Sequence, residues 1–142
     1  MTTLTGVYEI LVDQIPEPDS VLELYDAVGW LAYTRDPTRL LQGLHDSLRV
    51  CTAYDRERLI GLARVVGDGA TIIYLQDILV HPDYHRQGIG QALLDAVFEP
   101  FMEVRQHVLL TDTDDSQKAF YEATGFSDSM SLGVRSFVRY QT

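Results

Sequence analysis

The sequence ILVHPDYHRQGIGQALL, residues 78–94, combines the end of a strand, a glycine-rich turn and the start of a helix. Apolar residues lead into His81 and Pro82, where a strand should end because proline has no amide to donate. From Ile89 onward apolar side chains recur at helical spacing, which predicts a long amphipathic helix. Pro100 marks a kink or an early end of that helix.

A glycine-rich turn that opens a helix is a candidate site for a phosphate group. The amides of a helix's first turn lack helical partners and lie at the positive end of the helix dipole, and glycine lets an anion approach them. Two known phosphate motifs do not fit: a dinucleotide fingerprint needs a small residue at the position of Leu93, and no Gly-Lys-Ser/Thr occurs. A tight turn without any ligand would also use these glycines, so both interpretations stay open.

Outward from this stretch, the patterns predict a single α+β domain over residues 1–142. Three strands before the turn are separated by short polar segments, one of them Gly67-Asp68-Gly69, which is typical of an antiparallel meander. The predicted helices cover residues 20–28, 37–47, 89–101 and 115–124, and the predicted strands cover residues 7–12, 49–54, 59–66, 71–80, 108–111 and 134–140.

Charge and composition limit the classes of partner that the chain is expected to bind. The chain has 11 basic and 21 acidic residues and a net charge of −10, so a basic stripe that binds nucleic acid is hard to assemble. A cationic ligand such as an amine fits this charge better, although solubility alone also explains an acidic chain. The N-terminus lacks a signal-peptide pattern and no stretch approaches about 18 apolar residues, so we expect a soluble, cytoplasmic protein. Cys51 is the only cysteine and lies in an apolar run, which favours a buried, inert thiol over a nucleophile.

Two motifs, in this order, resemble the GNAT superfamily of acyl-CoA-dependent N-acyltransferases. The first is the strand end of residues 78–82 with the glycine loop of residues 88–94, and the second is FYEATGF at residues 120–126. The resemblance implies a three-layer fold in which a central mixed, mostly antiparallel sheet is flanked by helices. His85 stands where the family carries Gln or Arg, and Asp114 stands near an asparagine that contacts the cofactor arm in many relatives.

The resemblance also implies acetyl-CoA as the acyl donor. In relatives the pantetheine arm lies along a strand, which assigns the main chain of Ile78, Leu79 and Val80 to that arm. A plain core strand is compatible with this role, because packing uses side chains and the cofactor uses backbone. The pyrophosphate is then assigned to the amides of Arg86, Gln87, Gly88, Ile89, Gly90 and Gln91, with charge added by Arg86.

Amide formation from a thioester needs a proton acceptor for the amine and a proton donor for the leaving thiolate. Tyr121 is the predicted donor, since its hydroxyl is protonated at neutral pH and many relatives use a tyrosine at this helix position, while packing of the helix is the alternative. Asp77 is the best carboxylate for the base, acting directly or through water, and its alternative is a pair with an arginine such as Arg64. Trp30 and Tyr33 fall where relatives cap the acceptor site, so they are expected to form a wall for the amine or to pack in the core.

The predicted function is direct transfer of acetyl from acetyl-CoA to a primary amine, with a small amine or an aralkylamine as substrate. Two alternatives stay open: a non-catalytic acyl-CoA-binding or sensing module, and a peptide or protein N-acetyltransferase. The four histidines lack the spacing of a helical metal site, so no metal is predicted. Neither nucleic acid nor a membrane is expected as a partner, and a homodimer is left open.

Overall fold

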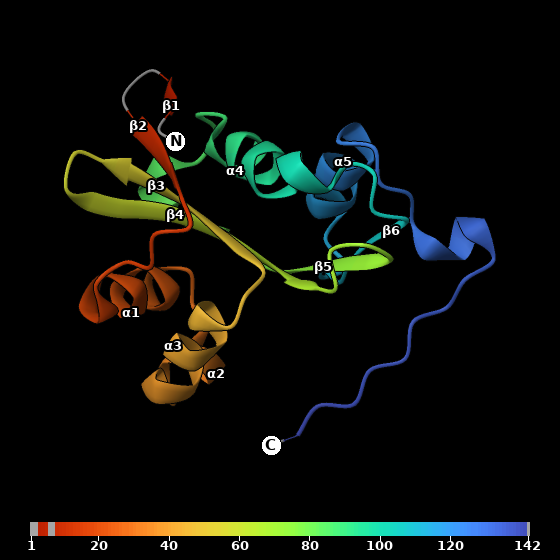
Figure 1. The fold of residues 1–142 in the computed structure, drawn as a ribbon, viewed down its shortest axis with the longest axis horizontal. Coiled ribbons are helices and arrows are strands. Elements are labelled where there is room, and N and C mark those ends of the chain that lie inside the picture. The colour runs from red at the N-terminus through yellow and green to blue at the C-terminus, as the bar shows by residue number, and fades with distance from the viewer. Residues whose placement is uncertain (1–2, 6–7, 142) are drawn as a thin grey trace. The chain divides into compact units, whose positions relative to one another are not determined.

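The computed structural model describes residues 3–5 and 8–141, and the chain divides into two compact units, residues 1–109 and 110–142 (Figure 1). Its strands are β1 (Thr3–Thr5), β2 (Tyr8–Val12), β3 (Arg49–Asp55), β4 (Arg58–Gly67), β5 (Ile72–Val80) and β6 (Gln106–Leu109). Its α-helices are α1 (Pro18–Ala27), α2 (Leu31–Thr34), α3 (Pro37–His45), α4 (Ile89–Phe98) and α5 (Asp115–Ala123). Short 3-10 helices cover Pro82–Tyr84, Glu99–Phe101 and Ser129–Leu132.

The first unit is built on a six-stranded sheet in the order β1-β2-β3-β4-β5-β6. Neighbouring strands are antiparallel from β1 to β5, whereas β6 pairs with β5 in parallel. The predicted meander is confirmed as β3, β4 and β5. A register shift between Arg64 and Val65 leaves Gln76 as an extra residue on β5, which is a β-bulge. The predicted fold class, a mixed and mostly antiparallel sheet flanked by helices, is confirmed.

Helices cover both faces of this sheet: α1, α2 and α3 lie on one face and α4 on the other (Figure 1). At Gly61, β4 approaches α4 so closely that a Cβ there would lie 2.9 Å from the Leu93 side chain and 3.3 Å from that of Ile89. Glycine therefore permits this spacing between strand and helix. The core on the opposite face consists of Val21, Leu24, Tyr25, Leu40, Leu44, Val50, Leu59, Leu62 and Leu79.

Helix and strand boundaries differ from expectation for identifiable reasons. The first helix begins at Pro18 and not at Ser20, because proline suits the first turn and Glu17 takes the N-cap position. The helix α4 ends at Phe98, since Pro100 has no amide to continue it, and a 3-10 turn follows. The short elements β1 and α2 were not predicted, and Val7 of the predicted first strand lies outside the described residues.

The prediction of a strand over residues 134–140 is wrong. The structure assigns this segment to no strand, and Phe137 and Tyr140 expose 89% and 82% of their surface. Alternating apolar residues favour a strand only where a neighbouring strand supplies hydrogen bonds and packing, which the alternation itself does not provide. Within the described residues, no helix is both long and apolar enough to cross a membrane.

Candidate active site

One edge of β5 is paired with another strand over only part of its length. The pairing with β6 reaches only Leu75, while β5 continues to Val80. The His81 amide donates to the Ile60 carbonyl on β4 at 2.8 Å, so the main chain of His81 faces β4. Main-chain groups alternate in direction along a strand, and those of Val80 and Ile78 therefore point away from β4. No other strand in the described part of the chain pairs with these groups. We call the outward main-chain groups of Ile78 and Val80 the free edge.

The structure places Leu79 differently from its two neighbours. Its partner on β4 is Leu62, so its main chain faces β4, and its side chain is buried in the core beneath α1 and α3. Of the three strand residues assigned to the cofactor arm, Ile78 and Val80 therefore share the free edge and Leu79 does not.

The turn between β5 and α4 presents amides without helical partners. Gly88 caps α4 with a φ of +79°, which glycine adopts without strain, and, apart from its own chain neighbours, no atom lies within 4 Å of the place of its missing Cβ. The first amide bonded to the helix start is that of Ala92, 3.0 Å from the Gly88 carbonyl, so the amides of residues 89–91 lack helical partners. Arg86 also has a positive φ of 65°, at a cost of about 1–2 kcal/mol. The turn therefore offers open space and free amides to an anion such as a pyrophosphate.

His85 links this turn to the free edge. Its Nε2 lies 3.1 Å from the Val80 carbonyl oxygen. A carbonyl oxygen can only accept a hydrogen bond, so Nε2 carries the proton in this contact. The side chain that departs from the family pattern thus engages one of the two free-edge residues.

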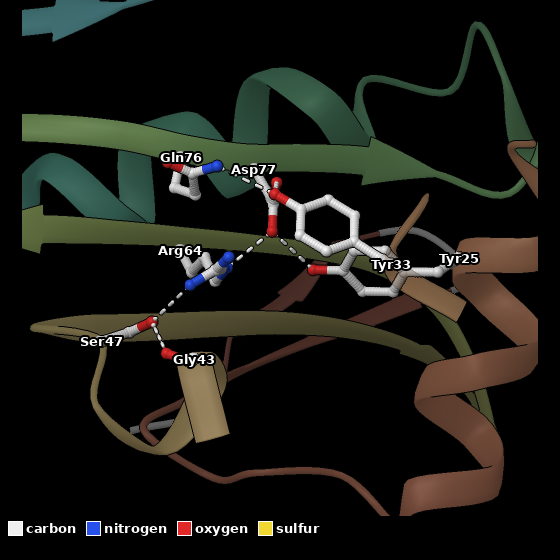
Figure 2. Close-up of polar contacts among 7 residues, drawn as sticks. All are labelled: Tyr25, Tyr33, Gly43, Ser47, Arg64, Gln76 and Asp77. Carbon is white, nitrogen blue, oxygen red and sulfur yellow. Dashed lines mark hydrogen bonds and ion pairs between the residues drawn. The ribbon is translucent and has the colours of Figure 1, made fainter. Parts of the chain in front are cut away.

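Asp77 is the centre of a polar network that joins β4 and β5 to the helices on one face of the sheet (Figure 2). The Arg64 Nε donates to Asp77 Oδ2 at 2.6 Å, and the two side chains are only 8% and 2% exposed. The Tyr25 hydroxyl donates to the same oxygen at 2.9 Å, and the Tyr33 hydroxyl donates to Oδ1 at 2.8 Å. Gln76 Nε2 donates to the Tyr33 oxygen at 2.9 Å, so the network runs from a buried carboxylate to an exposed amide.

The other side of Arg64 is held by α3 and the segment that follows it. Arg64 Nη1 donates to Ser47 Oγ at 3.3 Å, and Ser47 Oγ donates to the Gly43 carbonyl at 2.7 Å. A Cβ at Gly43 would lie 3.2 Å from Nη1. The guanidinium therefore fits against α3 because this helix carries a glycine there.

Burial and charge keep the phenols of this network protonated. Burial, and after it the Asp77 charge, raises the pKa of Tyr25 well above its ordinary value. The same two causes raise the pKa of Tyr33. Burial alone would lower the pKa of Arg64, but the Asp77 carboxylate and its hydrogen bond outweigh burial and raise it. At neutral pH the phenols therefore act as neutral donors to a carboxylate that a guanidinium balances.

The structure brings Asp77 and Tyr33 together, and it confirms the predicted pair of Asp77 with Arg64. The Trp30 and Tyr33 rings lie 6.3 Å apart and both side chains are half-buried. Sequence reasoning missed the hydroxyl contact of Tyr25 with Asp77. The signal for the pair was a charge of each sign within apolar strands, because a buried charge needs a partner.

Tyr121 lies on α5 in the second unit. Its ring packs against Phe120 at 5.1 Å and Phe126 at 5.9 Å between centroids. Burial, and then the charge of Asp112, raises the pKa of Tyr121, so its hydroxyl is protonated at neutral pH. Asp114 caps this helix by accepting from the Ser116 amide at 2.8 Å, which gives the carboxylate at this position a structural use.

A glycine ends the helix α5. Gly125 has a φ of +99°, its amide donates to the Glu122 main-chain carbonyl at 3.2 Å, and the Phe126 amide donates to the Tyr121 main-chain carbonyl at 3.0 Å. This pair of hydrogen bonds closes a helix in the Schellman arrangement. The FYEATGF motif is therefore a helix end that holds Tyr121 in a fixed place within its unit.

Two other predictions concern nucleophiles and metals. Cys51 is fully buried, and burial raises the pKa of its thiol to about 11, so the predicted inert thiol is confirmed. Within residues 3–5 and 8–141, no group of three His, Cys, Asp or Glu side chains is placed to hold a metal ion.

Comparison with known proteins identifies the family. The sequence pattern of the acetyltransferase (GNAT) domain matches residues 46–128, more than half of the chain. A solved GNAT-family acetyltransferase from Streptococcus pneumoniae is 33% identical, with a TM-score of 0.85 over 94% of this chain and 98% of that one. The PaiA N-acetyltransferase from Thermoplasma acidophilum, solved in complex with coenzyme A, shares the fold with a TM-score of 0.69 and 16% identity over 83% of this chain and 89% of that one.

Curated sequences agree with this result. Histone acetyltransferase TAP1 from Glycine max is 29% identical over an alignment of 114 positions, which covers 72% of this chain and 48% of that protein. This chain spans about half the length of the curated relatives it matches. The family pattern over residues 46–128 and the structural match at 33% identity together show that the chain belongs to the GNAT family of acetyltransferases.

Proposed function

We propose that this chain is a single-domain N-acetyltransferase that transfers acetyl from acetyl-CoA directly to a primary amine. The observation that carries this proposal is the continuity of the free edge with the turn of free amides before α4. A strand edge suits an extended arm that contains amides, and a helix N-terminus suits a pyrophosphate. Coenzyme A contains both, and a fold neighbour has been solved with it.

Different residues of this chain would hold different parts of acetyl-CoA, which supplies an acetyl thioester when bound. The main chain of Ile78 and Val80 would bind the pantetheine arm, with Leu79 anchoring the strand in the core beneath. The amides from Arg86 to Gln91 would hold the pyrophosphate, and the exposed Arg86 side chain adds positive charge there.

Transfer forms a C–N bond to the amine and breaks the C–S bond of the thioester. Tyr121 is the proposed proton donor to the departing sulfur, because a phenol keeps its proton at neutral pH and can donate it as negative charge develops on the sulfur. Asp77 is buried and already accepts three hydrogen bonds, so a base role for it requires transmission through the Tyr33 hydroxyl or water. Direct transfer also agrees with a chain whose lone thiol is buried.

A small amine or an aralkylamine is the proposed acceptor. The net charge of −10 favours cations, and Trp30 and Tyr33 expose aromatic surface beside the Asp77 network. One relative is named a histone acetyltransferase, so a lysine side chain of a protein is the competing acceptor.

The test is release of free thiol from acetyl-CoA with a panel of acceptors: small alkylamines, aralkylamines, a lysine-containing peptide and a peptide N-terminus. We expect the fastest release with a small amine. Preference for a peptide would shift the proposal to protein acetylation. Calorimetric binding of acetyl-CoA without any thiol release would identify a sensing module, and neither binding nor release would overturn the proposal.

A further inference from the structure

The Tyr33 oxygen is the point where the buried network meets the surface. On one side it donates to Asp77 Oδ1 at 2.8 Å, and that carboxylate is 2% exposed. On its other side it accepts from the exposed Gln76 side chain at 2.9 Å. Tyr25, the other phenol on the same carboxylate, is 0% exposed. Of these two phenols, Tyr33 is the one that can touch a ligand.

The network fixes the direction of the Tyr33 hydroxyl. A phenol has one proton, so an oxygen that donates to a carboxylate can only accept from any other partner. Hydrogen bonds to ionised groups are about twice as strong as neutral ones, which holds this proton toward Asp77. Arg64 secures Asp77 at 2.6 Å, and its guanidinium carbon lies 5.9 Å from the centre of the Tyr33 ring. The Tyr33 oxygen therefore turns its lone pairs away from Asp77, toward the exposed Gln76 side chain.

An outward acceptor of this kind suits an amine, because both the ammonium and the neutral amine donate N–H bonds. The Gln76 amide nitrogen already makes such a bond to Tyr33 and marks where a substrate nitrogen would lie. Gln76 is the bulged residue of β5, and it directly precedes Asp77 and Ile78 on the strand that carries the free edge. The Tyr33 oxygen, on α2, thus contacts the two residues of β5 that directly precede the free edge.

We propose that the Tyr33 hydroxyl oxygen binds the acceptor amine, and that Asp77 and Arg64 are positioning residues that keep this oxygen in its accepting orientation. This inference rests on the proposed function and deepens it, since it names the side chain that selects amines. Trp30, 6.3 Å from Tyr33 between ring centres, supplies the aromatic wall beside that oxygen.

The experiment compares Tyr33→Phe with Tyr25→Phe in thiol-release kinetics. Each variant removes one hydroxyl bonded to Asp77, at 2.8 and 2.9 Å, but only Tyr33 reaches the surface. We expect Tyr33→Phe to raise the KM for the amine about tenfold, the size of one hydrogen bond to a charged group, and to leave the KM for acetyl-CoA within about twofold. Tyr25→Phe should lower the thermal stability and leave the amine KM within about twofold of the parent.

A double-variant cycle with Asp77→Asn tests the positioning role. Alone, Asp77→Asn should raise the amine KM, and in the Tyr33→Phe background it should add little, because the oxygen that it orients is gone. Equal effects of Tyr33→Phe and Tyr25→Phe on the amine KM, or no effect of Tyr33→Phe, would overturn the inference while thiol release still supports the function. Absence of thiol release from the parent with every amine would overturn the function itself, and the inference with it.

Discussion

The cofactor half and the acceptor half of the candidate site are built from different parts of the polypeptide. The cofactor half uses main-chain groups of one continuous segment, residues 78–91. The acceptor half uses side chains that converge from distant segments, and Tyr33 and Asp77 are 44 positions apart. Every residue has the same main-chain groups, so the first half should depend on conformation and the second on residue identity. Substitutions can test this contrast.

The largest effect is expected at the buried ion pair. Arg64→Met should lower the free energy of unfolding by about 3–5 kcal/mol, because it leaves Asp77 as an uncompensated buried charge. Denaturant unfolding measures this loss. The double variant Arg64→Met with Asp77→Leu should recover most of it, since no charge is then left unpaired. Arg39→Met is the matched control, because Arg39 pairs with Asp36 at 3.4 Å with 87% of its side chain exposed.

Stability close to the parent for Arg64→Met would show that the network is not what holds the acceptor half together. The comparison of the halves would then lose its energetic basis, although the geometry of Figure 2 would remain.

Tyr121→Phe should lower kcat at least tenfold with little change in acetyl-CoA affinity, because general acid catalysis contributes about 10²–10⁴-fold. Burial raises the pKa of Tyr121, so its proton persists above the ordinary value of about 10, and the parent's kcat should start to fall only beyond that pH. Steady-state kinetics against pH measure both effects. Tyr140→Phe, 82% exposed in the same unit, is the control for loss of a hydroxyl, and unchanged kcat in Tyr121→Phe would assign this residue to packing.

Gly88→Ala tests the conformational half of the contrast. Binding of a ligand at a hundredfold excess over Kd stabilises a protein by about 2.7 kcal/mol, and we expect this shift with acetyl-CoA in the parent and its loss in the variant. Gly133→Ala is a close control, because Gly133 has a φ of +74° against +79° at Gly88 and open space at both Cβ positions. Both variants should lose similar intrinsic stability in thermal unfolding. Retention of the acetyl-CoA shift by Gly88→Ala would contradict the anion site.

The smallest effect is expected at His85, where a side chain meets the main-chain half. Removing the donor from the Val80 carbonyl in His85→Ala should free that oxygen and lower the Kd for coenzyme A by about two- to tenfold, the size of one neutral hydrogen bond. Isothermal calorimetry measures the change. His85→Gln keeps a side-chain donor and should bind like the parent. Weaker binding by His85→Ala would mean that the imidazole itself contacts the cofactor.

The same contrast explains what the sequence could predict. The turn and the start of α4 depend on neighbouring residues, so proline, glycine and helical spacing were enough to locate them. Three strand residues were assigned to the cofactor arm and the free edge contains two, because the alternation that turns Leu79 toward β4 depends on its pairing with Leu62. A local pattern does not contain that pairing.

For the acceptor half, the sequence offered Asp77 as a base or as a partner of Arg64, and the family resemblance offered Trp30 and Tyr33 as a wall. Arg64 and Asp77 stand directly opposite each other on β4 and β5, and opposite charges in apolar strands announce such a pair. The convergence of Tyr25 and Tyr33 on the carboxylate depends on how α1 and α2 pack over the sheet, which is a tertiary property. The prediction of a strand over residues 134–140 was wrong for the same reason, since a strand depends on a neighbouring strand.

The close approach of β4 to α4 at Gly61 ties ligand recognition to core packing. The two nearest atoms that a Cβ would meet belong to Leu93, at 2.9 Å, and to Ile89, at 3.3 Å, and Ile89 carries the first of the free amides. Both atoms belong to side chains, so a methyl group at position 61 would require either those side chains to turn aside or α4, with its row of amides, to move away from the strand. The packing between β4 and α4 therefore sets the distance from the sheet to the amides at the start of α4. A ligand fits when the same distance separates its amide-bearing arm from its anionic group.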